Sequence, residues 1–373
     1  MNKVNLLGLS RSSLENFLLM LDEKPFRARQ IIQWIYQKGI TDLNLMTDLS
    51  KTSRSKVLTV AQIRMPEVSF HGKSLDGTQK WLIKLDDGSQ IETVYIPEDH
   101  RGTLCVSSQV GCSFDCSFCA TGKQGFARNL DSGEIIAQVF IAARFLRASL
   151  ASGKKRSITN VVFMGMGEPL MNFDAVIETI NLIVDDLAYG LSKRKVTVST
   201  SGVVPEIYRL AKCSDVSLAV SLHSAFDNIR DRLVPLNRKY PIDRLLRAVK
   251  SYQASLSSHR SVTFEYTMLQ DINDSDNDAD ALAAIASDIR CKVNLIPFNQ
   301  FFGTEFKSSS TNRINAFQRR LSGRGILSTI RRTRGEDINA ACGQLSGMFK
   351  DKTFRRKRYS QKYETIKLAS ILE

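Results

Sequence analysis

No segment of this 373-residue chain is an uninterrupted apolar run long enough to cross a bilayer, and the chain has no low-complexity tract. Its first 24 residues lack the apolar core of a signal peptide, because Lys3, Arg11 and Glu15 interrupt the apolar pattern. The sequence therefore predicts neither a membrane protein nor a secreted one, and we expect a cytoplasmic protein. Its length is enough for about two domains and a sizeable core.

Histidine is also scarce, with 4 residues against 7 cysteines. In a reducing compartment, thiols serve as metal ligands or catalysts more often than as structural disulfides. The cysteines are therefore the first candidates for chemistry.

Acidic residues are few in the last part of the chain, where positive charge accumulates. The net charge is +14, yet residues 1–100 are nearly balanced, with 13 Lys and Arg against 12 Asp and Glu. Residues 307–373 hold 16 basic against 5 acidic residues, which is typical of a surface that binds a polyanion. A solvated tail explains 350–373 about equally well. RNA is favoured for the arginines before that tail, because guanidinium groups contact phosphates and stack on bases. These arginines are Arg313, Arg319, Arg320, Arg324, Arg331, Arg332 and Arg334.

The first hundred residues predict a small α+β unit. Apolar residues at helical spacing predict helices over 12–21 and 26–38. Segments 80–85 and 89–96 alternate between apolar and polar residues around Asp87-Gly88, a strong signal for a β-hairpin turn.

A polar break at 99–102 marks the expected domain boundary. We predict an accessory, RNA-binding domain over 1–99, a catalytic domain over 100–349 and a basic tail over 350–373.

From residue 103 onward, strand and helix patterns alternate. Six such units predict a parallel sheet with helices outside, either a partial barrel or a doubly wound sheet. Chemistry in such folds collects at the carboxyl ends of the strands, and four clusters of small and polar residues lie there, at 165–169, 199–202, 221–224 and 297–299. The expected strands are 103–109, 158–164, 195–200, 216–222, 261–268 and 291–297, and the expected helices lie near 131–148, 173–187, 204–212, 241–253 and 276–288.

The strongest local signal is the triplet Cys112, Cys116 and Cys119, spaced CxxxCxxC. This spacing would also suit one face of a helix, but Gly111 and Gly122 beside the triplet argue against a regular helix. A structural zinc site requires four ligands, and no histidine or fourth cysteine lies nearby at zinc-finger spacing. Three thiolates instead suit a 4Fe–4S cluster whose fourth iron stays open to the amino and carboxylate groups of S-adenosylmethionine (SAM). One electron from the cluster could then cleave the sulfonium and yield a 5′-deoxyadenosyl radical.

Two motifs resemble those of the radical SAM superfamily. The triplet has an aromatic residue, Phe118, before its last cysteine, and segment 165–169 is similar to the glycine-rich segment that receives the methionyl amino group. That segment is not a dinucleotide-binding GxGxxG, because Glu168 and Pro169 follow Gly167.

Longer segments resemble a narrower group, the RlmN family of bacterial adenine methyltransferases. These segments are 23–30, 46–50, 107–112, 124–130 and 338–344. The resemblance implies an α/β fold, a partial (βα)6 radical SAM barrel with a small amino-terminal α+β accessory domain. It also implies an enzyme that forms 2-methyladenosine in 23S ribosomal RNA and in the anticodon loop of some transfer RNAs.

The resemblance assigns cofactors and ligands as well. Cys112, Cys116 and Cys119 would hold the 4Fe–4S cluster, and two SAM molecules would be used per turnover. The expected partners are ribosomal RNA, transfer RNA and an electron donor such as flavodoxin, and the enzyme would be a monomer without membrane contact. The residues that would bind SAM are Gly167, Glu168, Ser199, Ser221, Leu222, His223 and Asn299.

Three further residues would carry the reaction that the resemblance implies. Cys342 would take a methyl group from one SAM, and nearby positive charge would favour its thiolate. The radical from a second SAM would remove hydrogen from this S-methyl group, and the methylene radical would add to carbon 2 of adenine. Glu92 would accept the ring proton, and Cys105 would attack the Cys342 sulfur, releasing the RNA and leaving a transient disulfide.

Without the resemblance, the residue types and their positions would not assign these catalytic roles. Cys105 would be read as a small buried side chain and Glu92 as an exposed carboxylate. Cys213 and Cys291 match no role, and we expect both in the core.

Two alternatives stay open. The related Cfr family methylates carbon 8 of adenine with the same cysteines, although segments 25–27, 48–50 and 124–126 favour carbon 2. A zinc-stabilised, non-catalytic RNA-binding protein is the alternative from another class, and iron content distinguishes it.

Overall fold

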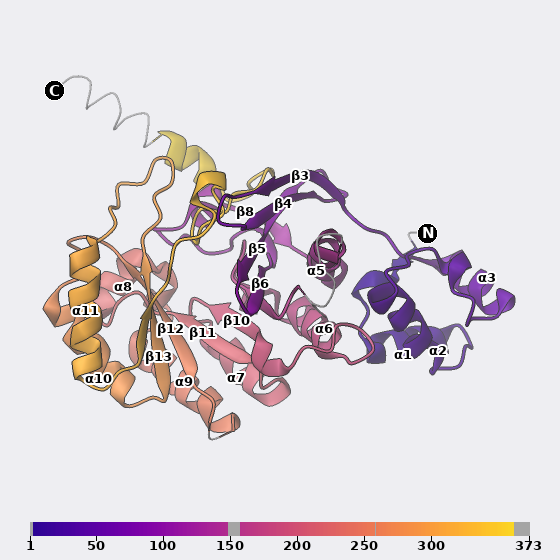
Figure 1. Ribbon diagram of the computed structural model, residues 1–373, viewed down its shortest axis with the longest axis horizontal. Coiled ribbons are helices and arrows are strands. Elements are labelled where there is room, and N and C mark those ends of the chain that lie inside the picture. The colour runs from indigo at the N-terminus through magenta and orange to yellow at the C-terminus, as the bar shows by residue number, and fades with distance from the viewer. Residues whose placement is uncertain (1–2, 148–156, 258, 362–373) are drawn as a thin grey trace.

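A ten-stranded sheet forms the centre of the protein in a computed structural model that describes residues 3–147, 157–257 and 259–361 (Figure 1). Its strand order is β14-β13-β12-β11-β10-β9-β6-β5-β4-β3. In this order, the strands from β14 to β6 run parallel to one another. Strands β6, β5, β4 and β3 pair antiparallel. The parallel strands are β6 (Arg101–Cys105), β9 (Asn160–Phe163), β10 (Val196–Thr200), β11 (Ser217–Ser221), β12 (Val262–Met268), β13 (Cys291–Pro297) and β14 (Ser328–Ile330).

Helices cover the outside of this curved sheet (Figure 1). Every residue of β12 is buried, as expected for a central parallel strand with both faces covered. All six expected strands and five expected helices are confirmed, while α11 and β14 add a unit that the periodicity did not predict. The helices are α5 (Ser132–Arg147), α6 (Phe173–Val184), α7 (Val204–Cys213), α8 (Asp227–Leu233), α9 (Ile242–Ser255), α10 (Asp276–Ser287) and α11 (Thr311–Gly323).

The amino-terminal part is a group of short helices, α1 (Arg11–Met20), α2 (Arg27–Ile32) and α3 (Lys51–Val60). The two expected helices are confirmed, and α2 continues as a π-helical turn to Gln37. The side chain of Ser10 caps α1 by accepting a hydrogen bond from the Ser13 amide. Strands β1 (Val4–Asn5) and β2 (Ala61–Gln62) close this part as a short parallel pair.

The predicted hairpin is confirmed as β4 (Gln79–Lys84) and β5 (Gln90–Glu98), and β3 (Glu67–Lys73) pairs with its outer edge. Strand β5 also pairs with β6 as far as Glu98 and Arg101, so one sheet crosses the expected boundary at 99/100. The domain limits therefore stay predictions.

The cysteine triplet lies in a loop at the top of the barrel, between β7 (Gln109–Gly111) and α4 (Ala120–Gln124), and β8 (Phe126–Asn129) pairs back onto β7. The chain from 339 to 361 returns over this loop, and residues 362–373 of the expected tail lie outside the described residues.

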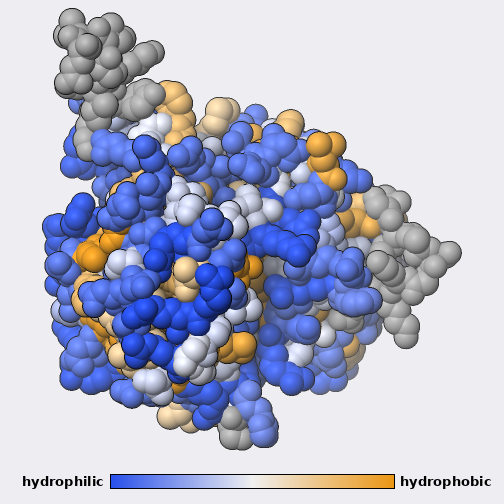
Figure 2. Space-filling model, turned by 60° about the vertical axis from the view of Figure 1, so that its left-hand side comes forward, coloured by the Kyte–Doolittle hydropathy of each residue, from blue (hydrophilic) through white to orange (hydrophobic). Residues whose placement is uncertain are grey.

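Hydrophobic residues do not form a continuous patch on the surface visible in Figure 2. On the face in Figure 2, hydrophobic residues are scattered among hydrophilic ones. No helix within the described ranges combines the length and the hydropathy that a bilayer crossing requires.

Candidate active site

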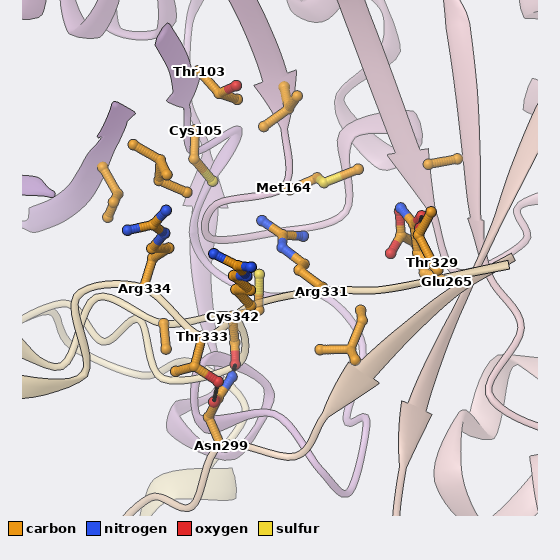
Figure 3. Close-up of a pocket in the computed structure, with 18 of the residues that line it drawn as sticks. Thr103, Cys105, Met164, Glu265, Asn299, Thr329, Arg331, Thr333, Arg334 and Cys342 are labelled. Atoms are coloured by element: carbon orange, nitrogen blue, oxygen red, sulfur yellow. Dashed lines mark hydrogen bonds between the residues drawn. The ribbon is translucent and has the colours of Figure 1, made fainter. Parts of the chain in front are cut away.

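Two adjoining cavities lie inside the barrel, the smaller at the carboxyl ends of the parallel strands and the larger reaching toward their amino ends. The smaller one, of about 160 Å³, is bordered by Phe118 and Cys119 of the cysteine loop. The larger one, of about 430 Å³, extends into the barrel and is lined by Cys105 (Figure 3). Cys342 lines both, so the expected methyl carrier lies where the two meet. The residues shared by the two cavities are Met164, Glu265, Ile296, Pro297, Asn299, Arg331 and Cys342.

The three cysteines of the triplet share one irregular loop, as their glycine neighbours predicted. The Cys119 amide donates to the Cys116 carbonyl (3.2 Å), and the Phe114 amide lies 3.4 Å from the Cys112 sulfur. Burial raises the pKa of Cys116 to about 12, and the nearby Cys119 adds to the rise. The pKa of Cys112 is raised by burial and by the nearby thiols of Cys116 and Cys119.

This donor set fits an iron–sulfur cluster better than a single ion. Among the described residues, no three His, Cys, Asp or Glu side chains converge closely enough to hold one metal ion. A zinc site needs four converging ligands, whereas in a 4Fe–4S cluster each thiolate binds its own iron and the sulfur atoms stay apart. Three neighbouring thiols that do not converge therefore suit the cluster.

A glycine lets the segment after β9 pass close to the cysteine loop. Gly167 has a φ of +98°, and a Cβ there would lie 2.4 Å from the Cβ of Gln109. The Gln109 side-chain oxygen accepts hydrogen bonds from the amides of Ser113 (3.1 Å) and Glu168 (3.0 Å). Gln109 thus ties the cysteine loop to the glycine-rich segment, a role that the sequence did not reveal.

Glu168 is buried at the floor of the smaller cavity. Its carboxylate accepts hydrogen bonds from the amides of Leu170 (3.2 Å) and Ser201 (2.8 Å). Burial raises the pKa of Glu168 to about 6, against the effect of these hydrogen bonds. The carboxylate therefore links the ends of β9 and β10.

His223 is also buried, with a φ of +57°. Its Nδ1 accepts a hydrogen bond from the Thr267 amide (3.0 Å), which leaves the proton of the neutral ring on Nε2. Burial lowers the pKa of His223 to about 3, so the ring is neutral at pH 7. The ring packs edge-on against Phe118, with centroids 4.4 Å apart.

Six of the seven residues expected to bind SAM line the smaller cavity. The exception, Leu222, is fully buried beside it and lines neither cavity. The six are Gly167, Glu168, Ser199, Ser221, His223 and Asn299.

A buried arginine that the sequence gave no reason to select supports this cavity. Arg230 of α8 donates hydrogen bonds to the main-chain carbonyls of Ser201 (2.7 Å), Ser221 (3.1 Å) and Leu222 (3.0 Å). Burial lowers the pKa of Arg230 to about 10. Its guanidinium group thereby holds the ends of β10 and β11 together.

Arg331 stands beside the two distant cysteines. The pKa of Arg331 is raised, first by the Cys342 thiol and further by Glu265 and Cys105. It lines both cavities and points toward their interior (Figure 3), which differs from the RNA-phosphate contact expected for it.

Several of the other arginines expected to contact RNA are engaged within the protein. Arg313 pairs with Asp276, and Arg320 and Arg324 pair with Asp280 (2.6 and 2.9 Å). These partners lie on α10, so this face of α11 is neutralised rather than free for phosphate.

Glu92 is only 5% exposed, so the residue-level interpretation of an exposed carboxylate is wrong. It pairs with Lys80 (2.9 Å) and accepts a hydrogen bond from the Ser346 amide (2.8 Å). Burial raises its pKa, and Lys80 opposes the rise. It lies on the same side of β5 as Val94 and Ile96, which line the larger cavity, but the segment that carries Cys342 covers it.

The first part of the basic tail packs on the cysteine loop. Arg355 is 8% exposed and donates hydrogen bonds to the carbonyls of Gly122 (3.1 Å) and Cys112. Asp351 accepts from the amides of Phe126 and Arg356 (both 3.1 Å). Neither interpretation of the tail, solvated or phosphate-bound, applies to Arg355.

Of the two cysteines expected in the core, Cys213 and Cys291, one is not buried. Cys291 is partly buried against the core, but Cys213 is exposed, so its expected core position is wrong.

Comparisons with known proteins match nearly the whole chain. Residues 4–63 match the family model for the ribosomal RNA large subunit methyltransferase N-terminal domain, and residues 106–283 match that of the radical SAM superfamily. The dual-specificity RNA methyltransferases RlmN of Francisella tularensis subsp. novicida (strain U112) and subsp. mediasiatica (strain FSC147) are each 54% identical over 364 residues, 97% of both chains. The crystal structure of a radical SAM methyltransferase from Sphaerobacter thermophilus superposes with a TM-score of 0.84 at 43% identity, covering 92% of this chain and 99% of that one.

Proposed function

The chain belongs to the RlmN family of radical SAM RNA methyltransferases, and from this premise we propose that it methylates carbon 2 of adenine in ribosomal and transfer RNA, with Cys342 as the methyl carrier. The observation that carries the proposal is the position of Cys342, which lines both the smaller and the larger cavity. A carrier at this junction can receive a methyl group on one side and present it to a base on the other.

The cysteine triplet fits the 4Fe–4S cluster that the family requires, and the smaller cavity beside Cys119 fits SAM. The chemistry that these cofactors supply when bound is one-electron activation of a methyl group. In our proposal, Glu168, His223 and Asn299 orient SAM, and the neutral His223 offers its Nε2 hydrogen to the cavity.

Cys105 is the proposed resolving thiol, because it lines the larger cavity and its pKa responds to the charge of Cys342. Its sulfur would bond to the Cys342 sulfur as the bond from Cys342 to the RNA breaks. Burial raises the pKa of Cys105, and the positive charge of Arg331 opposes that rise.

Glu92 is the proposed proton acceptor. Its raised pKa suits a group that takes up a proton, and it faces the cavity side of β5. Its engagement with Ser346 supports a reaction in which the Cys342 segment shifts to uncover it.

The 54% identity to an RlmN methyltransferase over 97% of this chain supports carbon 2 over the carbon-8 chemistry of the Cfr family. A non-catalytic, zinc-stabilised RNA-binding protein does not agree with membership of a methyltransferase family. We further propose a cytoplasmic protein, because the sequence offers no signal peptide or membrane-spanning run. From the resemblance we also propose a monomer that receives electrons from a donor such as flavodoxin.

In the direct test, anaerobically reconstituted enzyme is incubated with SAM, a reductant and either ribosomal or transfer RNA. The nucleosides are then analysed by mass spectrometry. We expect 2-methyladenosine, absent with Cys342→Ala. Formation of 8-methyladenosine, or of no methylated adenosine, would contradict the proposal.

A further inference from the structure

Glu265 is a buried carboxylate at the junction of the two cavities, and it has no role in the reaction proposed above. It lies in the middle of β12, opposite Ser221 of β11 and Asn294 of β13, and its side chain lines both cavities (Figure 3). It is 4% exposed. This position places a carboxylate inside the barrel, where burial of a charge costs free energy unless the charge is paired.

Only one of its two oxygens is satisfied. Oε1 accepts a hydrogen bond from Nδ2 of Asn294 (3.0 Å), whereas the buried Oε2 accepts none from any residue that the structure describes. Buried polar atoms in folded proteins are nearly always hydrogen-bonded, and each exception calls for an explanation. An acceptor without a donor, in the wall of a cavity, is explained by a ligand that brings the donor.

The Glu265 carboxylate is held in place by its neighbours. Oγ1 of Thr329 donates to Oδ1 of Asn294 (2.6 Å), which fixes the amide so that Nδ2 faces Glu265. Burial raises the pKa of Glu265, and Arg331 and Lys292 oppose that rise, although neither donates a hydrogen bond to Oε2. Oε2 is therefore an acceptor oriented in advance, at little further cost in conformational entropy.

Both molecules expected to meet here contain adenosine. SAM in the smaller cavity and the target nucleotide in the larger one each offer a 6-amino group and ribose hydroxyls as donors. A carboxylate accepts from these groups, and it repels the carbonyl oxygen that guanine carries in place of the amino group.

We propose that Oε2 of Glu265 accepts a hydrogen bond from an adenosine bound at this junction, and so positions it and selects it over other purines. The inference rests on the proposed function, because that function places adenosine on both sides of Cys342. The 6-amino donor belongs either to SAM or to the RNA, and the experiment separates these sources.

The test variant is Glu265→Gln. Its amide oxygen can still accept from Asn294, so an NH₂ donor then faces the cavity in place of the acceptor. Losing a hydrogen bond to a charged group should weaken the affected step about 10- to 100-fold. Glu206→Gln, on the outer helix α7, is the matched control and should behave as the parent. Iron content and thermal unfolding verify the fold of both.

The first measurement is the dissociation constant of labelled SAM for reconstituted enzyme without RNA. If the donor belongs to SAM, this constant rises about 10- to 100-fold in Glu265→Gln. The second is single-turnover methylation at saturating SAM of RNA with either adenosine or 6-unsubstituted purine at the target position. If the donor belongs to RNA, the variant is slowed on adenosine but much less on purine, as in a double-mutant cycle.

A SAM dissociation constant and methylation rates equal to those of the parent would overturn the proposal. If Glu265→Gln does not fold, Thr329→Val replaces it as the test variant, because it removes only the hydrogen bond that fixes Asn294. It should give a several-fold loss in one of the same two quantities, and parent-like values would again overturn the proposal. A parent enzyme that methylates no RNA would refute the proposed function instead, while the SAM measurement would still test Glu265.

Discussion

The side-chain amide of Asn299 donates a hydrogen bond of 3.0 Å to the main-chain carbonyl of Cys342 (Figure 3). Its Oδ1 accepts in turn from Thr333 (3.1 Å), so Asn299, two residues after β13, is tied to the returning chain at two points. Asn299 lines the smaller cavity as well. One side chain therefore connects the expected SAM site to the segment that carries the methyl acceptor.

This connection predicts the effect of a substitution at Asn299 on methylation of Cys342. Asn299→Asp keeps the acceptor for Thr333 but loses the donor to the Cys342 carbonyl. Methylation of the Cys342 sulfur should slow at least about tenfold, since the nucleophile is no longer held in line with the methyl group. Mass spectrometry of the Cys342 peptide over time measures this rate, and parent-like loading would show that the hydrogen bond does not position the segment.

Iron binding should depend on each member of the triplet. Replacing Cys112, Cys116 or Cys119 by alanine removes one of three iron ligands, so iron and the brown colour should be lost after anaerobic reconstitution. The matched control is Cys213→Ala, because Cys213 is exposed and far from the loop in sequence. Full iron content in a triplet variant would refute the cluster assignment.

Two neighbouring arginines should give opposite results. Arg355→Gln leaves the carbonyls of Cys112 and Gly122 without their donor, a loss of about 2 kcal/mol in unfolding free energy. Because those carbonyls belong to the cysteine loop, we expect lower iron content and a more labile cluster. Unchanged iron retention would show that the tail does not support the loop.

Arg356→Gln is the counterpart, because Arg356 is exposed. It should leave iron content unchanged. If it contacts phosphate, the salt dependence of RNA affinity should flatten by about 0.7–0.9 in the log–log slope. An unchanged slope would mean that this arginine is only solvated.

The periodicity of the chain was sufficient to predict a parallel sheet with helices outside, and the family resemblance decided for a partial barrel over a doubly wound sheet. Strands such as β11 are short apolar runs between polar ends, and helices such as α9 carry one apolar stripe, so local sequence determines both. Strand β14 was not predicted because it has only three residues, too few for a periodic pattern to be recognised. The cysteine triplet was recognisable because its chemistry depends on spacing within one loop.

Burial of charged side chains was not predictable. Glu92, Arg230 and Arg355 look like ordinary surface residues in sequence, and each is buried by partners far away or by main-chain carbonyls. Glu92 shows the reason, since Ser346, one of its partners, lies 254 residues later. Contacts at such separation follow from the whole topology and leave no local pattern.

The pH dependence of the final step follows from Cys105. Burial raises its pKa to about 12, Cys342 adds to the rise, and Arg331 opposes it. The thiol form therefore dominates at neutral pH, and the reactive thiolate increases about tenfold per pH unit below that pKa. Release of RNA from the covalent adduct, followed by rapid quench, should accelerate about tenfold from pH 7.5 to 8.5. A flat profile would contradict attack by a free Cys105 thiolate.

The two distant cysteines should fail in different ways, because only the covalent mechanism gives them different roles. Cys342→Ala removes the methyl carrier, so RNA should bind but remain unmodified and uncrosslinked. Cys105→Ala leaves methyl loading and addition to the base intact and removes the resolving thiolate. An enzyme–RNA adduct through the Cys342 sulfur should then accumulate and survive denaturing electrophoresis.

A purely structural Cys105 would behave otherwise. Loss of this small buried side chain would cost roughly 1–3 kcal/mol of stability, yet the enzyme would still turn over repeatedly. The double variant should match Cys342→Ala, since no adduct can form without the carrier. Electrophoresis with labelled RNA, followed by mass spectrometry of the shifted band, distinguishes these cases. Normal turnover by Cys105→Ala without a shifted band would remove Cys105 from the mechanism, even though it lines the same cavity as Cys342.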